Sequence, residues 1–122
     1  MSQEGSVGLS GWAKLLRVFI GEADRLEGRP LYECIVLAAR EHGLAGATVL
    51  RGVLSYGATS HMHSAKVLRL SEDLPIVIEI VDSEEKVARF LPTLDSLLER
   101  ADQGGLVTLE KVEVIRYSSH VT

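Results

Sequence analysis

Two histidines with the spacing of metal ligands, His61 and His63, stand in the segment YGATSHMHSAKVLRLSEDLP (56–75). Residues two apart in an extended segment point to the same side, so both imidazoles could bind one zinc or copper ion. A closed structural zinc site has about four ligands. The missing ligands would have to come from His120, a carboxylate or another subunit. Two solvated loop histidines explain the pattern as well. Metal binding is therefore an alternative, and we expect no constitutive metal site.

Other side chains with catalytic chemistry have simpler explanations. Cys34 lies in an apolar stretch, and no histidine stands at a spacing that would indicate a catalytic cysteine–histidine pair. This favours a structural thiol over a nucleophile. Asp82, Glu84 and Glu85 could act as acid–base carboxylates, but the start of a helix also accounts for them. The common phosphate-loop, dinucleotide, serine-hydrolase, zinc-protease and paired-cysteine motifs are absent from the sequence. We therefore expect a protein that is not an enzyme.

Three charged residues near the first strand could contact a ligand. Arg25 and Arg29, in the loop before the first helix, could hold an anion, although a solvated loop explains them too. Glu22, in the IGE sequence that ends the strand, could face a ligand or cap the strand. The sequence leaves these alternatives open.

Composition limits the classes of function. The chain has 122 residues, of which 46% are hydrophobic and 25% charged, as in a single globular domain. The net charge of −4 provides no broad basic field, which argues against a nucleic-acid partner. The chain has one cysteine, no signal-peptide pattern and no apolar run near the roughly 20 residues of a membrane span. We expect a cytoplasmic protein.

Hydrophobic periodicity predicts four strands and two helices. The predicted strands are 13–21, 46–57, 75–82 and 106–117, and the helices cover 30–43 and 84–101. Pro30 is expected at the first helical position, Ser83 as an N-cap, and Pro92 as a kink inside the second helix. The predicted buried stripes are Leu31, Ile35, Ala38 and His42 on the first helix, and Val87, Phe90, Leu91, Leu94, Leu97 and Leu98 on the second.

Two strands carry irregular features. Gly52 inside the second strand suggests a bulge or a close backbone approach. In the last strand, apolar residues change phase between Leu109 and Val112, which predicts a bulge or break near Glu110–Lys111.

The order β-α-β-β-α-β predicts a ferredoxin-like α+β sandwich, in which one face of a four-stranded antiparallel sheet carries both helices. The domain is expected over 12–118, with a disordered N-terminal tail at 1–11 and a short tail at 119–122. A long loop is expected at 57–74, within which 66–70 extends the third strand. Strands 46–57 and 75–82 have apolar residues in both phases, so the open sheet face needs a partner.

Three stretches of the sequence resemble the PII-like signalling proteins, specifically a bacterial and archaeal branch of unknown function. They are RVFIGEADRLEGRPLYECIVLAAREHGLAGATVLRG, LRLSEDLPIVIEIVDSEEKVARFLP and GLVTLEKVEVIRY. The resemblance implies a homotrimer packed about the open sheet faces, with small-molecule clefts between subunits. It also implies that loop 57–74 rearranges with ligand and engages a target protein, for which a membrane transporter is one candidate.

The nucleotide-binding residues of PII proteins are matched only in part. GATV (46–49) is similar to their Gly-Met-Thr-Val stretch, which implies that Thr48 contacts a base. Gly57 matches their Gly-Phe-Gly turn, while Ser55 does not. Gly104 stands where they have a Gly-Lys pair, but no lysine follows it.

The C-terminal match is also partial, because Arg116 corresponds to one of two phosphate-binding arginines and Ser118 replaces the other. Each missing charge-assisted bond weakens binding by about 1.5–3 kcal/mol. We therefore expect a ligand that is smaller or less charged than a triphosphate, and an adenine nucleotide is one candidate. The expected ligand-binding residues are Thr48, Gly57, Gly104, Arg116, Glu22 and Arg29.

Overall fold

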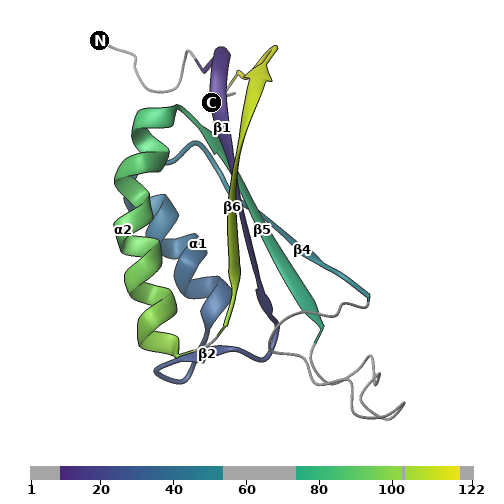
Figure 1. Cartoon of the computed structure of the whole chain (residues 1–122), viewed down its shortest axis with the longest axis vertical. Helices are drawn as coiled ribbons and strands as arrows, with labels where there is room; N and C mark the ends of the chain where they lie inside the picture. Colours follow the sequence, from purple (N-terminus) through teal and green to yellow (C-terminus); the bar gives the residue numbers. More distant parts are fainter. Residues whose placement is uncertain (1–8, 54–73, 103, 119–122) are drawn as a thin grey trace.

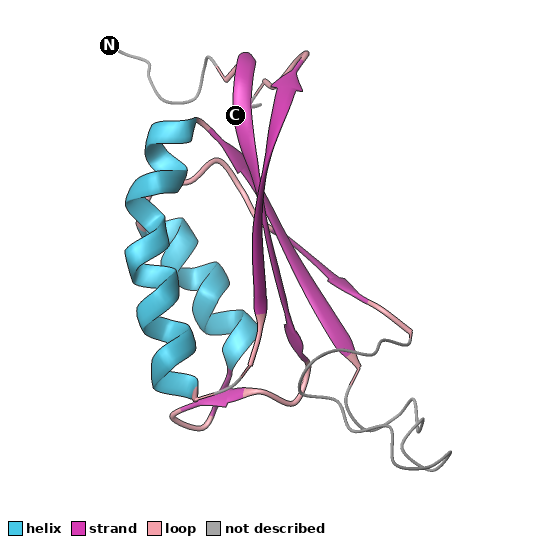
Figure 2. Ribbon diagram, viewed as in Figure 1, coloured by secondary structure: helices cyan, strands magenta, loops and turns pink. Residues whose placement is uncertain are grey.

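A computed structural model describes residues 9–53, 74–102 and 104–118 of the chain. It contains a twisted four-stranded sheet with two helices on one face (Figures 1 and 2). The elements are β1 (Gly11–Gly21), β2 (Arg25–Leu26), β3 (Arg29–Pro30), α1 (Leu31–Glu41), β4 (Thr48–Arg51), β5 (Pro75–Asp82), α2 (Glu84–Ala101) and β6 (Leu106–Val114).

The main sheet has the strand order β4-β5-β1-β6, and every neighbouring pair is antiparallel. The two central strands, β1 and β5, therefore come from opposite halves of the sequence, as two interlocked β-α-β units require. This confirms the predicted ferredoxin-like α+β sandwich. The small antiparallel ribbon of β2 and β3, which the sequence did not predict, precedes α1.

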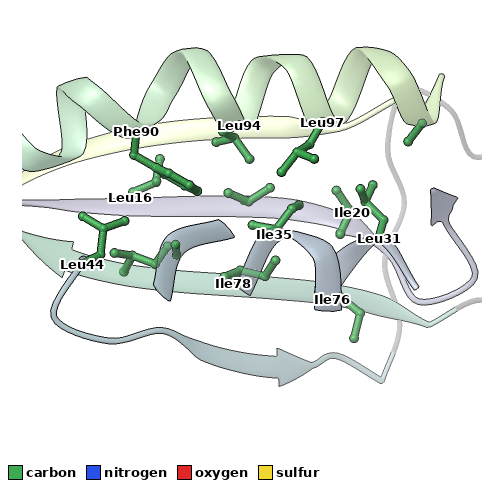
Figure 3. Packing of buried hydrophobic residues seen from close by; sticks show 14 of the residues in the cluster. Leu16, Ile20, Leu31, Ile35, Leu44, Ile76, Ile78, Phe90, Leu94 and Leu97 are labelled. Carbon is green, nitrogen blue, oxygen red and sulfur yellow. The ribbon is translucent and has the colours of Figure 1, made fainter. Parts of the chain in front are cut away.

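The hydrophobic core lies between the helices and one face of the sheet (Figure 3). On β1 and β5, alternate residues point toward the helices and are almost fully buried: Leu16, Val18, Ile20, Ile76, Ile78 and Ile80. The helices contribute Leu31, Ile35, Ala39, Val87, Phe90, Leu94 and Leu97 to the same cluster. No helix in the described part of the chain is both long and apolar enough to span a membrane.

The first helix begins and ends close to the predicted positions, with two corrections. Pro30 is the N-cap residue of α1, one position before the first helical residue. On the buried stripe, Ala39 is buried in place of Ala38, and His42 is exposed. His42 is the C-cap residue of α1. Its ring contacts Phe90 of α2 edge-on, with the two ring centroids 5.3 Å apart.

The second helix has the predicted N-cap, since the Ser83 hydroxyl accepts a hydrogen bond from the Lys86 N–H at 3.2 Å. Leu91 and Leu98 are only partly buried, and Ala101 extends the buried stripe. Pro92 lies within α2, and the kink predicted there stays a prediction.

The bulge predicted near Glu110–Lys111 is wrong. β6 pairs with β1 in one unbroken register, from Leu106 opposite Phe19 to Val114 opposite Gly11. As an edge strand beyond the full cover of the helices, β6 leaves apolar residues of both phases exposed, Leu109 to 46%. A change of phase in its sequence therefore requires no change in pairing.

The second predicted strand is shorter than expected. β4 covers only Thr48–Arg51, and positions 54–57 lie outside the described residues. The close approach predicted at Gly52 is confirmed, because a Cβ atom there would lie 2.8 Å from Pro75 Cγ. The Gly52 N–H also donates to the Pro75 carbonyl at 2.8 Å. Glycine is therefore required where the chain leaves β4 beside β5.

Candidate functional site

An ion pair between Glu22 and Arg51 lies at the end of the sheet where the described part of the chain stops at Val53 and resumes at Leu74. The Glu22 N–H donates to the Leu74 carbonyl at 2.8 Å, and the Glu22 carboxylate accepts from Arg51 at 2.5 Å. Both side chains are partly exposed, which leaves them accessible to a ligand. The pair connects β1 to the last residue of edge strand β4. Sequence reasoning considered Glu22 but missed Arg51, whose only signal is its position just before Gly52.

The predicted residues Arg29 and Gly104 lie at the same end of the molecule. Arg29 is exposed on the β2–β3 ribbon, whose turn residue Glu27 pairs with Arg100 of α2 at 2.9 Å. Gly104 precedes β6, and a Cβ atom on the adjacent Gly105 would lie 3.3 Å from the Phe19 carbonyl. The loop between α2 and β6 therefore packs closely against the end of β1.

Arg116 lies at the opposite end of the sheet. It follows Val114, whose partner is Gly11 at the start of β1, whereas Leu106 pairs with Phe19 near its end (Figure 1). The nine residues of β6 cover roughly 30 Å at about 3.4 Å per residue. One protomer therefore cannot place Arg116 and Glu22 around the same small molecule.

Thr48 occupies a third location, on edge strand β4. It is exposed and lies directly opposite Glu79 of β5, on the sheet face that the helices leave uncovered. We call this the open face; its central residues are Leu15, Arg17 and Phe19 of β1 and Val77, Glu79 and Val81 of β5.

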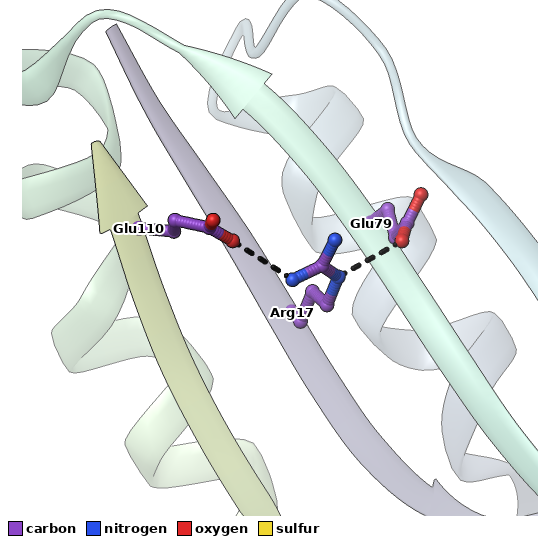
Figure 4. Close-up of polar contacts among 3 residues, drawn as sticks. All are labelled: Arg17, Glu79 and Glu110. Carbon is purple, nitrogen blue, oxygen red and sulfur yellow. Dashed lines mark hydrogen bonds and ion pairs between the residues drawn. The ribbon is translucent and has the colours of Figure 1, made fainter. Parts of the chain in front are cut away.

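Three charged side chains meet at the centre of the open face (Figure 4). Arg17 Nε donates to Glu79 Oε2 and Arg17 Nη1 to Glu110 Oε1, both at 3.0 Å. The hydrogen bond to Glu79, and then the one to Glu110, raises the pKa of the Arg17 guanidinium above its ordinary value. Sequence reasoning missed this cluster. Its signal is one charged residue in the middle of each of the apolar strands AKLLRVFIG and PIVIEIVD.

Two side chains considered for catalysis make contacts that support the fold. Asp82 is buried, and its carboxylate accepts hydrogen bonds from the Ala45 N–H at 2.8 Å and the Ser83 N–H at 2.6 Å. It therefore connects the end of β5 to the segment that leads into β4. Cys34 is partly buried and packs against the core.

The predicted ligand residue Gly57 and the histidines His61, His63 and His120 lie outside the described residues. Within the described ranges, no three histidine, cysteine or acidic side chains gather as metal ligands. The interpretation of the two loop histidines thus stays a prediction.

Solved structures with the same fold include PII-like proteins. CPII of Thiomonas intermedia K12, in a structure bound to ADP, AMP and acetate, matches with a TM-score of 0.61 and 22% identity, over 87% of this chain and 91% of that one. A PII-like signalling protein of Thermus thermophilus matches with a TM-score of 0.58 and 20% identity, over 86% and 91%. These matches show that the chain shares its fold with PII-like proteins.

The sequence places the chain more narrowly. The model of the DUF190 family, described as "Uncharacterized ACR, COG1993", matches residues 13–114, and the chain belongs to this family. A UPF0166 protein of Aquifex aeolicus is 44% identical over 84% of this chain and 92% of its own length. Another, from Methanocaldococcus jannaschii, is 34% identical over 85% and 93%.

Proposed function

We propose that this protein is a PII-like signalling or adaptor protein without enzymatic activity. It binds a small anionic ligand between the subunits of a homotrimer, and the ligand alters how loop 57–74 engages a target protein. An adenine nucleotide is the first candidate ligand, because solved PII-like structures of similar fold contain ADP and AMP. A membrane transporter is one candidate target.

The observation that carries this proposal is the separation of the candidate residues. Glu22, Arg51 and Gly104 lie at one end of the sheet and Arg116 at the other. A ligand contacting both groups requires two protomers, so that the Arg116 end of one subunit meets the Glu22 end of its neighbour. A cleft between subunits provides this arrangement.

The cations on the two sides favour a ligand with one or two phosphates. Arg116 supplies one guanidinium, and Arg51, held by Glu22, supplies a second. Guanidinium groups form strong paired hydrogen bonds with phosphate oxygens. The chain lacks the lysine that would follow Gly104 in a PII protein, so a third phosphate would have fewer partners.

The first prediction tests the cationic contacts. Arg116→Ala and Arg51→Ala should each weaken ADP binding by roughly 1.5–3 kcal/mol, or about tenfold to more than a hundredfold, in titration calorimetry. Arg89→Ala is the matched control, because Arg89 is an exposed arginine on α2 paired with Glu85 at 3.3 Å. ADP affinity that is unchanged in both variants would reject these residues as ligand contacts.

Mixing the two variants tests whether one ligand contacts two subunits. Trimers reassembled from equal amounts of Arg116→Ala and Arg51→Ala chains should recover about a quarter of the wild-type sites, because random mixing pairs two intact ends at that frequency. No recovery at ADP concentrations that saturate the wild type would reject a site shared between two subunits.

A further inference from the structure

The charged cluster at the centre of the open face belongs to a polar row that crosses all four strands. The strand register sets Glu79 directly opposite Arg17, with a threonine at each end of the row. The complete row is Thr48, Glu79, Arg17 and Thr108, with Glu110 two residues further along β6 on the same face.

Apolar side chains lie on both sides of this polar row. The row nearer the Glu22 end consists of Leu50, Val77, Phe19 and Leu106. Leu50 and Leu106 are 47% and 56% exposed. On the other side, Val81 and Leu15 lie opposite each other next to Glu110. The open face is therefore a charged line within an apolar surface.

The occupant that fits this surface is a second copy of the same chain. The apolar rows need cover, and both described helices lie on the other face (Figure 2). The row contains one guanidinium and two carboxylates, so its excess charge is negative, which disfavours an anionic lipid surface. A wholly apolar partner would bury the carboxylates without further hydrogen-bond donors. Another copy brings its own Arg17 and threonine hydroxyls.

We infer that the polar row fixes the register in which copies pack across the open face, and with it the number of copies. The inference rests on the trimer of the proposed function. Apolar contacts are non-directional, so the flanking rows alone would tolerate shifted arrangements. A shift that buries Glu79 or Glu110 against leucine is costly, because a buried charge needs a partner. A buried polar group in an apolar interface fixes register in coiled coils in the same way.

The test removes the whole row of charges. A triple variant with Arg17→Met, Glu79→Met and Glu110→Met keeps side-chain length and leaves no charge to match. It should associate at least as tightly as the wild type, but native mass spectrometry should show several oligomer sizes in place of one. A triple variant with the single mass of the wild type would overturn the inference.

A single substitution keeps the test decisive if the triple variant does not fold. Arg17→Met leaves Glu79 and Glu110 without their shared cation and should weaken association on the order of a hundredfold or more. Arg89→Met, which breaks an exposed pair on α2, should change nothing. Association of Arg17→Met equal to that of the wild type would also overturn the inference. A monomeric wild type would instead reject the trimer of the proposed function.

Discussion

The two faces of the sheet are built from the same strands yet differ in chemistry. On β1, Leu16 and Val18 point toward the helices and are fully buried, while Arg17 between them lies on the open face. On β5, Ile78 and Ile80 alternate in the same way with Glu79. In this central part of the sheet, the helix-covered side of β1 and β5 is apolar, whereas the open face carries the three charged side chains of Arg17, Glu79 and Glu110.

The two faces have different chemical requirements. The helices bury the inner face of the central strands β1 and β5 almost completely, so the residues there need only fit in size and shape. The open face combines exposed leucines with charges that are paired but only partly shielded from water. A partner for that face must cover apolar area and also satisfy polar groups. The inner face therefore determines the stability of the chain, and under the proposal above the open face determines what the chain binds.

Shortening two neighbouring residues of β5 should have the largest effect and tests whether the two faces have separate roles. Ile78→Ala creates a cavity in the core and should lower the free energy of unfolding by about 2–5 kcal/mol in denaturant titration. The loss should be the same at every protein concentration, because Ile78 lies within the protomer. Val77→Ala, one residue away on the open face, should mainly change how the unfolding midpoint depends on protein concentration.

Equal behaviour of the two variants would contradict the division of roles. If Val77→Ala destabilised the protein as much as Ile78→Ala at all concentrations, the open face would be part of the protomer's own core. If Ile78→Ala changed the concentration dependence, the helix-covered face would take part in assembly.

A smaller effect is expected at Asp82, where the helix-covered face ends. Asp82→Ala leaves the Ala45 N–H without its carboxylate partner and should cost about 1–3 kcal/mol of stability. Asp82→Asn retains one acceptor oxygen and should cost less. Since the bond from Ala45 positions the segment before β4, amide exchange should accelerate in β4 more than in β1. Equal acceleration in both strands would show that Asp82 has no local role in holding β4.

The sequence predicted those parts of the fold that depend on local patterns. Strand β5 has the predicted bounds, and Ser83 caps α2, because alternation, apolar runs and capping residues are local signals. The β2–β3 ribbon was missed because two residues per strand show no periodicity. The false bulge in β6 came from assuming that every apolar residue of a strand must be buried.

The candidate site was less predictable, because it depends on which strands are neighbours. Arg17 and Glu79 are 62 positions apart, and Arg17 and Glu110 are 93 apart, so no sequence spacing connects them. Arg116 and Glu22 could each be proposed from the sequence. Their location at opposite ends of the sheet follows only from the β1–β6 register.

The smallest effect should come from weakening the helical cover without touching either sheet face. Ser83 is the N-cap of α2, and Ser83→Ala removes the hydroxyl that accepts from the Lys86 N–H, which should cost about 1 kcal/mol of stability. Ser96→Ala, at an exposed position inside the same helix, is the matched control and should be neutral or slightly stabilising, because alanine favours helix. Because the cap supports only the helix-covered face, light scattering should give the same oligomeric mass for both variants. If Ser83→Ala lowered that mass, stability of the inner face and assembly through the open face would be coupled, and the two faces could no longer be treated as independent.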